Sequence, residues 1–318
     1  MKILKTLLLA SSITVLSLIA TVTANAATAE VKKNGNNYTT TLNGKTTNTS
    51  DLATAINTGI GNGNNTVNIS CGGNLSKTVN LQNGTTLNFS SSQTITAATG
   101  NSVAFKAKNK NNVSINGLKL TGKAGMGIRF SGCNNTSVTN CNISGNGIGI
   151  GIRIDTNESN PWNYSHNRGC TVKNITLSNL QDMGVETYSI DNYDIDNITG
   201  TKLGSCVVLI NDGKNGKIGT VTGTDCCVNG GYAALRFAND CDGATVKKVN
   251  ANHCGRGFFT CTNSKNITVE SVDIKNCIRN GILIENGSNV IVKSGTVTGC
   301  SILIKNSPGS STSGVVKK

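Results

Sequence analysis

The sequence predicts an all-β fold in which a single chain winds into a solenoid, the parallel β-helix. Three observations predict it. Short segments rich in Val, Ile and Phe recur at a nearly fixed spacing from about residue 103 onward. The stretches between them are rich in Asn, Gly and Thr, and the chain contains 37 Gly but only 2 Pro, a composition suited to strands and tight turns. No repeat places apolar residues at the three- and four-residue spacing of a helix.

The composition of the 318 residues excludes several other classes of protein. Charged residues make up 14% and apolar residues 36% of the chain, against about 25% and 45–50% (glycine counted) in a typical globular domain. So few prolines and charges argue against a disordered chain. The only long apolar run stands at the N-terminus, so we expect no later segment to span a membrane.

Residues 1–26 have the three parts of a secretory signal peptide. Lys2 and Lys5 form a short basic segment, residues 7–20 are an apolar core, and residues 24–26 read Ala-Asn-Ala before Ala27. The apolar core is short for a membrane anchor, which needs about 20 residues. We therefore expect a secreted, extracellular protein with no membrane attachment in its mature form.

The chain is strongly basic, with a formal net charge of +13. Removal of the leader with its two lysines leaves +11, a charge that attracts polyanions and is screened by salt. A secreted protein meets acidic polysaccharide more often than nucleic acid. The charge therefore predicts an acidic polysaccharide partner and no nucleic acid, with a generally basic surface as the alternative. We expect a monomer.

Residues 45–60 are expected to cap the N-terminal end of the solenoid. Ser50 and Asp51 can cap a short helix that continues through Asn57. Its apolar residues form one face: Leu52, Ala53, Ala55 and Ile56. A helix at this place would cover the open end of the first coil, which otherwise exposes apolar side chains and strand edges.

Two interleaved series of strand-like segments form the repeat. The first series begins at residues 127, 151, 184, 207, 234, 257, 281 and 301, and the second at residues 113, 138, 172, 193, 218, 246, 267 and 290. A period in the low twenties indicates a solenoid, and the Leu-x-x-Leu-x-Leu register of leucine-rich repeats is missing. We predict one β-helix domain over residues 27–306, with coils stacked about 4.8 Å apart, and a flexible tail over residues 307–318.

Asparagines recur at the predicted corners of successive coils. The members of this series are Asn116, Asn140, Asn174 and Asn197. A side-chain amide can satisfy the backbone of a turn, and asparagine tolerates left-handed backbone conformations. We interpret the series as a structural ladder.

The chain contains twelve cysteines and no Cys-x-x-Cys pair, which gives little support to a zinc or redox motif. Cys254, Cys277 and Cys300 stand 23 residues apart and should share one column, continued by Cys206 and by Cys226 or Cys227. Such neighbours suit buried reduced thiols, which we favour. They also fall inside the Cα spacing of a disulfide, about 4.4–6.8 Å, so disulfides stay open.

The coil repeat, the capping helix, the leader and the basic charge together resemble the pectate-lyase-like superfamily of right-handed parallel β-helix proteins, over about residues 45–305. The resemblance implies a single-stranded right-handed coil and a secreted protein that acts on or binds polysaccharides. The Asn-Thr-Asp, Asp-Asp, Gly-His-Gly and Arg-Ile-Lys segments of polygalacturonases are absent. The Arg-x-Pro-x-x-Arg segment of pectate lyases and the Asp-Pro-His-Asp segment of mannuronan epimerases are absent too. The resemblance therefore carries over no catalytic residue.

Strand side chains alternate, so inward Ile128 and Phe130 would leave Arg129 pointing outward. The outward column then holds Arg129, Arg153, Glu186, Leu209, Arg236, Phe259, Leu283 and Leu303. The next outward column holds Ser131, Asp155, Tyr188, Asn211, Ala238, Cys261, Glu285 and Lys305. Charge is concentrated in the middle coils, where we expect the functional groove.

The largest irregular insertion, residues 155–169, lies beside these coils. It holds the only Trp of the chain, Trp162, together with Tyr164 and His166. Long loops on a rigid scaffold often carry function, and aromatic rings beside charged groups suit a sugar site. In the alternative, Trp162 only packs on the coil surface.

Glu186 is the only Glu of the central coils and lies between Arg153 and Arg236 in the predicted column. One interpretation is a structural ion pair. The other is a reactive cluster with Asp155, Tyr188, Asn211, Asp212, Arg236 and Asp240.

Two reactions fit such a cluster. Elimination from a uronate needs a base, for which Tyr188, His166 or Arg256 is available, and neutralisation of the carboxylate by arginine. Hydrolysis needs two carboxylates, about 5–5.5 Å apart for retention or 6.5–9.5 Å for inversion, which Glu186 with Asp212 or Asp155 could supply.

A cofactor is not required by any motif. Asp155, Asp212 and Asp240 could hold Ca²⁺ through oxygen ligands, but no spacing motif supports it. The sequence therefore predicts no certain cofactor, with Ca²⁺ as a possibility.

The basic charge and the arginine-rich column favour a lyase acting on a uronate-containing, pectin-like polysaccharide. A glycoside hydrolase and a non-catalytic carbohydrate-binding or adhesin β-helix are the alternatives. The predicted catalytic residues are Glu186, Arg236, Tyr188 and Asp212. The predicted substrate-binding residues are Arg153, Asp155, Trp162, Tyr164, His166, Asn211, Asp240 and Arg256.

Overall fold

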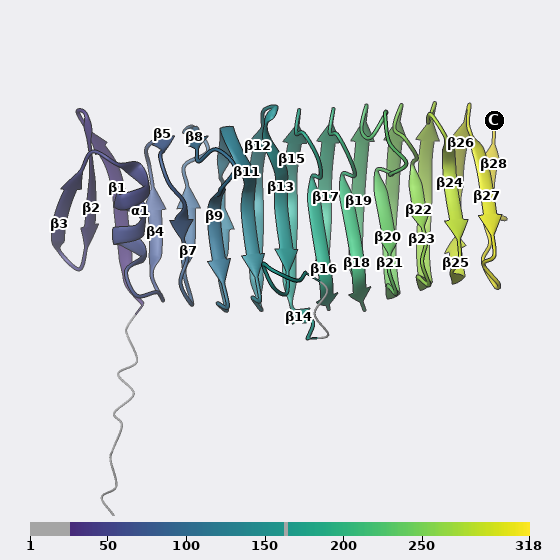
Figure 1. Cartoon of the computed structure of the whole chain (residues 1–318), viewed down its shortest axis with the longest axis horizontal. Coiled ribbons are helices and arrows are strands. Elements are labelled where there is room, and N and C mark those ends of the chain that lie inside the picture. Colours follow the sequence, from purple (N-terminus) through teal and green to yellow (C-terminus); the bar gives the residue numbers. More distant parts are fainter. Residues whose placement is uncertain (1–25, 162–164) are drawn as a thin grey trace, which may run out of the picture.

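The chain folds into a right-handed parallel β-helix of about 11 turns, with 59% strand and 3% helix. The computed structural model describes residues 26–161 and 165–318. Figure 1 shows the coils stacked in a single row, with the helix and a small hairpin sheet at the N-terminal end. The predicted all-β solenoid is confirmed.

The N-terminal cap is larger than predicted. Before the helix, the chain forms three antiparallel strands: β1 (Thr28–Asn34), β2 (Asn37–Leu42) and β3 (Lys45–Thr49). Strand β1 also pairs in parallel with β4 (Thr66–Ile69) of the first coil, so the hairpin sheet continues into the solenoid. Sequence analysis missed this sheet because its Thr- and Lys-rich strands have no counterpart in the repeat.

Helix α1 (Leu52–Ile60) is the predicted capping helix, extended to Ile60. Asp51 is the N-cap residue, and its Oδ2 accepts a hydrogen bond of 2.8 Å from the Thr54 backbone N–H. The predicted apolar face is fully buried, together with Ile60. The helix therefore covers the end of the first coil as expected.

Two stacks of strands run along the solenoid. We call the first stack the arginine face; it is made of β11 (Lys119–Ser131), β13 (Gly147–Asp155), β16 (Val185–Asp191), β18 (Val208–Lys214), β20 (Leu235–Ala238), β22 (Phe258–Thr260), β24 (Asn280–Glu285) and β27 (Ser301–Lys305). The second stack is made of β10 (Ser114–Asn116), β12 (Thr136–Ser144), β15 (Cys170–Ser178), β17 (Asp194–Thr201), β19 (Lys217–Thr224), β21 (Asp242–Asn252), β23 (Lys265–Lys275), β25 (Ser288–Val292), β26 (Gly295–Thr298) and β28 (Val315–Lys317).

The first coils and the insertion contribute shorter strands. These are β5 (Gly73–Leu75), β6 (Val79–Asn80), β7 (Thr86–Phe89), β8 (Ile95–Ala98), β9 (Val103–Lys108) and β14 (Asn167–Arg168). Strand β9 pairs in parallel with β11 and so begins the arginine face.

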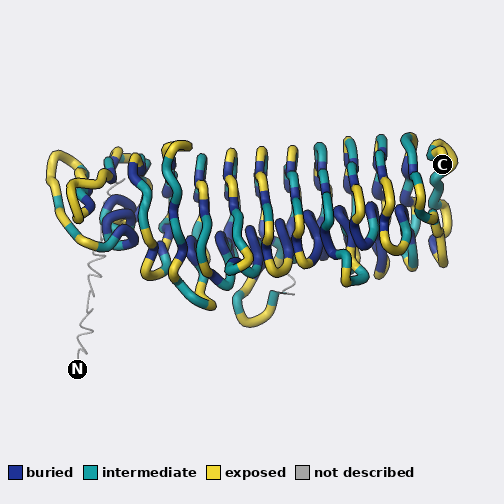
Figure 2. Tube along the Cα trace, turned by 90° about the horizontal axis from the view of Figure 1, so that it is seen from above, coloured by how far each residue is buried: buried dark blue, intermediate teal, exposed yellow. Residues whose placement is uncertain are grey.

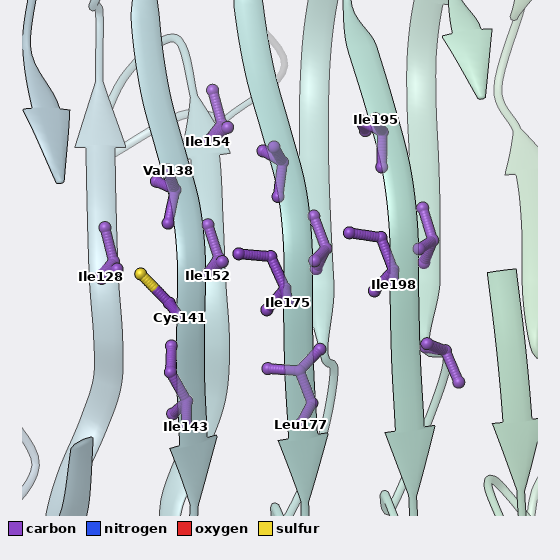
Figure 3. Close-up of a cluster of buried hydrophobic side chains, with 14 of the residues drawn as sticks. Ile128, Val138, Cys141, Ile143, Ile152, Ile154, Ile175, Leu177, Ile195 and Ile198 are labelled. Atoms are coloured by element: carbon purple, nitrogen blue, oxygen red, sulfur yellow. The ribbon is translucent and has the colours of Figure 1, made fainter. Parts of the chain in front are cut away.

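The interior is a stack of aliphatic side chains in matching positions of successive coils (Figure 3). Ile128 is in register with Ile152, and Ile175 with Ile198. All four are at most 1% exposed, and fully burying a side chain of this kind stabilises the fold by about 1.5–3 kcal/mol. Because side chains alternate along a strand, the residues between these inward side chains point to the outside of the solenoid.

The predicted asparagine ladder is present. The side-chain amide of Asn140 donates to Asn116 Oδ1 at 2.8 Å, Asn174 donates to Asn140 at 3.0 Å, and Asn197 donates to Asn174 at 2.9 Å. The last three have φ between 53° and 57°, the left-handed region that asparagine tolerates. The ladder joins four successive coils at one corner.

The C-terminal segment differs from the predicted flexible tail. Strand β28 pairs in parallel with β26, and the Asn289 N–H donates to Pro308 O at 3.0 Å. An uncovered last coil would leave a row of unpaired backbone groups. Residues 307–318 satisfy part of that row and thus extend the solenoid.

Two further features of the described residues bear on function. All twelve cysteines are free thiols, and Cys300 is the one that is only half-buried. In the described part of the chain, no helix is long and apolar enough to cross a membrane.

Candidate functional site

The outward column predicted on the arginine face is present in the predicted register. Its members pair in the order Arg129, Arg153, Glu186, Leu209, Arg236, Phe259, Leu283 and Leu303. The insertion projects from the same part of the solenoid, where Figure 2 shows it as the exposed loop that ends in the grey trace. Charged and aromatic side chains of the middle coils therefore share one surface.

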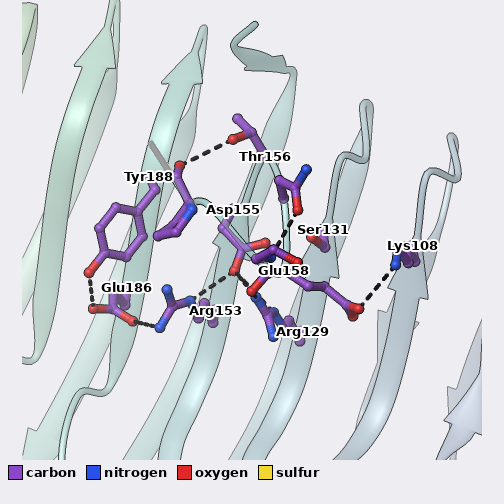
Figure 4. Close-up of polar contacts among 12 residues, drawn as sticks. Lys108, Arg129, Ser131, Arg153, Asp155, Thr156, Glu158, Glu186 and Tyr188 are labelled. Atoms are coloured by element: carbon purple, nitrogen blue, oxygen red, sulfur yellow. Dashed lines mark hydrogen bonds and ion pairs between the residues drawn. The ribbon is translucent and has the colours of Figure 1, made fainter. Parts of the chain in front are cut away.

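A buried network of charges occupies one half of this surface (Figure 4). Asp155 Oδ2 accepts from Arg129 Nη2 at 2.7 Å and from Arg153 Nε at 2.8 Å. Arg153 Nη1 also lies 3.1 Å from Glu186 Oε2, and the Tyr188 hydroxyl donates to Glu186 Oε1 at 2.9 Å. Asp155 is 0% and Glu186 4% exposed. We call these five residues the acidic network.

The first part of the insertion closes over the acidic network. Glu158 forms ion pairs with Lys106 at 2.6 Å and Lys108 at 3.3 Å. Asn167 Nδ2 donates to the backbone oxygen of Asp155 at 2.7 Å. Asp155 is therefore a buried anchor between two guanidinium groups. The predicted pairing of Asp155 with Glu186 as hydrolytic carboxylates does not fit, because the Asp155 carboxylate is held by the two arginines and has no access to solvent.

Glu186 is a carboxyl group in an almost completely buried position. Burial raises its pKa above the ordinary value, although Arg153 opposes the shift. A second carboxyl group, Asp182, lies close enough to raise the pKa of Glu186 further; Asp182 is exposed overall, and partial desolvation of its carboxyl group raises its own pKa. Sequence analysis missed Asp182 because it stands in the corner before β16, outside the strand alternation.

Tyr188 is an unsuitable base. Burial raises the pKa of its phenol, and the neighbouring Glu186 raises it further. Its hydroxyl donates to Glu186 rather than accepting a proton. Its ring lies under Arg153, with 4.8 Å between the Arg153 Cζ atom and the ring centroid, so its position orients the network.

The other half of the arginine face carries an arginine cluster on aromatic rings. The Arg236 Cζ atom lies 4.6 Å from the ring centroid of Tyr232 and 5.0 Å from that of Phe259. The Arg256 Cζ atom lies 4.7 Å from the Phe259 ring. Among the described residues, the ion-paired arginines are Arg129, Arg153 and Arg168, so neither cluster arginine has a carboxylate partner.

The remaining contacts of this cluster are weak or neutral. Arg236 Nη2 donates to Cys261 Sγ at 3.2 Å, and Arg236 Nε is buried without a hydrogen-bond partner. Arg256 donates to the backbone oxygen of Gly231 and, at 3.4 Å, to Asn280 Oδ1. We define the arginine cluster as Arg236 and Arg256, which lie on the rings of Tyr232 and Phe259, together with the neighbouring Arg279.

Repulsion within the cluster is visible at Arg256. Burial lowers the pKa of its guanidinium, and the charges of Arg279 and Arg236 lower it further, with partial compensation from Glu285. An anion placed among these groups would remove the repulsion. Sequence analysis missed the role of Tyr232, which stands in the loop before β20.

Asp212 and His166 lie together at a corner of the solenoid, apart from the acidic network. His166 Nδ1 lies 2.7 Å from Asp191 Oδ1, and His166 Nε2 lies 3.1 Å from Asp212 Oδ2. Ser189 Oγ donates to the same Asp212 oxygen at 2.9 Å. The predicted pair of Glu186 with Asp212 does not form, because Asp212, with φ 49°, directs its carboxylate to His166 and Ser189 at this corner.

Two neighbouring cavities follow the same corner of the solenoid. One of about 670 Å³ is lined by Asn134, Asn135, Ser165, His166, Arg168, Asp191 and Lys214. The other, of about 720 Å³, shares Lys214 and is lined further by Asp240, Asp242, Asn263, Lys265, Asn286, Gly287, Ser288 and Asn306. Asp240 therefore belongs to this corner and is not part of the arginine face.

Three other predicted binding features can be placed or set aside. Asn211 is 4% exposed, and its Oδ1 accepts from Asn239 Nδ2 at 2.9 Å, a structural role. Trp162 and Tyr164 lie outside the described residues. The possible calcium ligands Asp155, Asp212 and Asp240 lie in three different places, and no group of three or more His, Cys, Asp or Glu side chains in the described ranges is arranged to hold a metal ion.

Comparison with known proteins gives the fold. No family model and no curated protein matches the sequence. A solved 1,3-alpha-1,4-beta-D-galactose-4-sulfate-3,6-anhydro-D-galactose-2-sulfate 4 galactohydrolase matches with a TM-score of 0.54 and 14% identity, over 78% of this chain and 67% of that chain. The enzymatically active domain of bacteriophage CBA120 tailspike protein 2 matches with a TM-score of 0.51 and 11% identity, over 90% of this chain and 46% of that chain. At such low identities the matches establish a shared β-helix fold, and the chain spans about two thirds of the first protein and less than half of the second.

Proposed function

We propose that this protein is a secreted enzyme that cleaves an anionic polysaccharide by elimination. The observation that carries the proposal is the arginine cluster: Arg236 and Arg256 stack on Tyr232 and Phe259 without a carboxylate partner. The leader predicted over residues 1–26 supports secretion.

The cluster suits one unit of an acidic sugar chain. A guanidinium group binds a carboxylate through two parallel hydrogen bonds. Tyr232, which is 37% exposed, offers an apolar ring surface to the C–H face of a sugar, while Phe259 is buried beneath the two arginines. Because the two arginines already repel one another, a sugar carboxylate gains more from binding here than beside an arginine that has its own acid. The net positive charge of the chain favours the same partner.

Elimination assigns different tasks to the two arginines. Arg236 neutralises the uronate carboxylate, which makes the adjacent carbon acidic. Arg256 is the proposed base because it lies beside Arg236 on the Phe259 ring, whereas the Tyr188 hydroxyl donates to Glu186 and both ring nitrogens of His166 face carboxylates. The base takes the proton beside the carboxylate, the electron pair forms the C4=C5 double bond, and the glycosidic oxygen departs with a proton from solvent.

The structural neighbours support the substrate class. The first is named as a galactohydrolase of sulfated galactose units, and the second as an enzymatically active tailspike domain. A chain with the same fold and a surface cluster of unpaired arginines fits a related role on a charged polysaccharide.

Hydrolysis is the second candidate function, favoured by the acidic network. Glu186 and the neighbouring Asp182 both have raised pKa values. In this alternative Glu186 donates a proton to the leaving oxygen, and Asp182 is the second carboxylate. Cleavage would then lie on the coil of Glu186, three coils before the coil of Phe259 and Arg256.

The reaction product separates the two candidates. The mature protein is incubated with uronate-containing, sulfated and neutral polysaccharides, and near-ultraviolet absorbance is followed together with new reducing ends. We expect absorbance from an unsaturated uronate product to grow on an acidic substrate. New reducing ends without absorbance would show that the protein is a hydrolase and not a lyase. If both signals are absent on every polysaccharide, the protein is a non-catalytic carbohydrate-binding protein.

Matched variants locate the reaction on the surface. We expect Arg236→Ala and Arg256→Ala each to lower turnover by about 10²-fold or more. Arg168→Ala removes the same charge from a side chain that is 74% exposed at the corner and should leave turnover unchanged. Full activity in both cluster variants, with loss in Glu186→Gln, would move the chemistry to the acidic network.

A further inference from the structure

Four cysteines form a column at one corner of the second stack. Each cysteine follows a strand residue by two positions, and these strand residues are paired with one another from one coil to the next. Those residues are Thr224, Asn252, Lys275 and Thr298, and the cysteines are Cys226, Cys254, Cys277 and Cys300. The in-register pairing places neighbouring cysteines about one strand spacing, 4.8 Å, apart.

The column differs in part from the sequence prediction. Cys226 belongs to it through the pairing of Thr224 with Asn252. Cys206 lies instead in an apolar cluster of the arginine face, with Met183 and Leu209. The reason is that Thr201 pairs with Thr224, so Leu203, two residues after Thr201, takes the place in the column that was predicted for Cys206.

Within the column, the sulfur atoms are associated in two pairs. Cys254 lies close enough to Cys226 to shift the pKa of that thiol, and Cys300 lies close enough to shift the pKa of Cys277. Each of the three thiols of Cys226, Cys254 and Cys300 also contacts the backbone oxygen two residues before it, at 3.3, 3.6 and 3.4 Å. A Cα spacing of about 4.8 Å lies within the range that a disulfide bridges, about 4.4–6.8 Å.

We propose that Cys277 and Cys300 are a site of oxidative cross-linking, at which exchange with a disulfide compound joins the last two coils. The Cys300 thiolate attacks one sulfur of the compound and releases one thiolate. Cys277 then loses its proton and attacks the Cys300 sulfur of the mixed disulfide, which releases the second thiolate. Two protein thiols are oxidised by two electrons, and one disulfide compound is reduced to two thiols.

The order of attack follows from access and acidity. Cys300 is half-buried, whereas Cys277 is 6% exposed. Burial, together with the adjacent Cys300, raises the pKa of Cys277 to about 12, so Cys277 is a poor first nucleophile. In the second step, Cys277 needs only to attack the sulfur of the adjacent Cys300, which already carries the thiol group that leaves. Cys226 and Cys254 are 0% exposed, so the same exchange there requires local opening and is slower.

Such a bond would stabilise the C-terminal end of the solenoid. Cys300 directly follows β26, whose outer edge is covered by the three residues of β28. A bond to Cys277 ties this last coil to the corner after β23. The cross-link would therefore oppose fraying at the end where the stack is thinnest.

The test is oxidation of the folded mature protein with oxidised glutathione at pH 8, followed by acid quenching, alkylation of the remaining thiols and non-reducing tryptic mapping. Cys277 and Cys300 fall in separate peptides, residues 276–279 and 294–305. We expect these two peptides to become linked first, and residues 218–236 and 249–256, which carry Cys226 and Cys254, to become linked more slowly.

Two serine variants make the result specific. Cys300→Ser should abolish the link to residues 276–279, while Cys133→Ser, a buried cysteine outside the column, should leave it intact. Circular dichroism before oxidation confirms that each variant is folded. The proposal is overturned if Cys277 and Cys300 remain fully alkylated, if glutathione stays attached to Cys300 without resolving, or if Cys277 pairs with Cys254.

Discussion

At the scale of single residues, strand alternation correctly predicted which side chains point outward on the arginine face. The outward position of Arg153, Glu186 and Arg236 follows from one inward isoleucine and a period of two. Alternation does not place Asp212, whose side chain a left-handed backbone turns to the corner. It also could not identify Asp182, because a corner loop has no period from which a direction can be inferred.

Glu186 offers a residue-scale test of which force dominates the acidic network. Its pKa is raised by burial against the pull of Arg153. A carboxyl group with a raised folded pKa contributes stability below its unfolded pKa, about 4.3, and loses that contribution as pH rises through the folded value. Relative to Glu186→Gln, the native protein should therefore be most stable near pH 4 and lose ground toward pH 7.

The measurement is thermal unfolding of both proteins over pH 4–8. Glutamine keeps the shape and the hydrogen-bond acceptor for Tyr188, so the difference between the curves reports the charge. A native protein that gains on the variant as pH rises would mean that the ion pair with Arg153 at 3.1 Å outweighs burial.

At the scale of elements, the sequence predicted those that interrupt the repeat but not all of their contacts. The capping helix was predictable because Asp51 precedes a one-sided apolar stretch. The insertion was visible as one long repeat. Its docking through Glu158 onto Lys106 and Lys108 was not, since these lysines belong to an earlier coil and ion pairs leave no periodic signal.

Asp51 gives the element-scale prediction. Burial opposes its ionisation, but hydrogen bonds from Ser76 and Thr54 outweigh burial and hold its pKa well below the ordinary value. Asp51→Ala should lower the free energy of unfolding by about 1 kcal/mol. Because the folded pKa is depressed, the stabilisation is present above the unfolded value of about 3.9 and is lost as pH falls through the folded value.

Urea unfolding at pH 7 and pH 3 measures both effects. Asp273→Ala is the matched control, because Asp273 is paired with Lys275 on the exposed surface and should cost little. Equal losses in the two variants would show that the helix cap contributes no more than an ordinary surface carboxylate.

At the scale of the whole molecule, the period alone specified the architecture. Segments 20–33 residues apart can bury their apolar faces only by stacking, so the solenoid followed without reference to any single contact. What the period does not specify is where the surface becomes functional. Every coil contributes one residue to the outward column. Only the side chains of the middle coils form the acidic network and the arginine cluster.

The basic charge of the molecule leads to a prediction about how it finds its substrate. Steering of a polyanion by a charged protein can raise association rates by about 10–10³-fold, and the screening length falls from about 10 Å at 0.1 M salt to 3 Å at 1 M. We expect the association rate constant with polygalacturonate, followed by stopped flow, to fall by about tenfold or more over that range.

Arg256→Ala and Lys247→Ala each remove one positive charge, the first from the arginine face and the second from an exposed position on β21. If the arginine cluster receives the polysaccharide, Arg256→Ala slows association more and also speeds dissociation, because it removes a contact as well as a charge. Equal effects of the two variants on association, with dissociation unchanged, would mean that the whole basic surface attracts polyanions without a site.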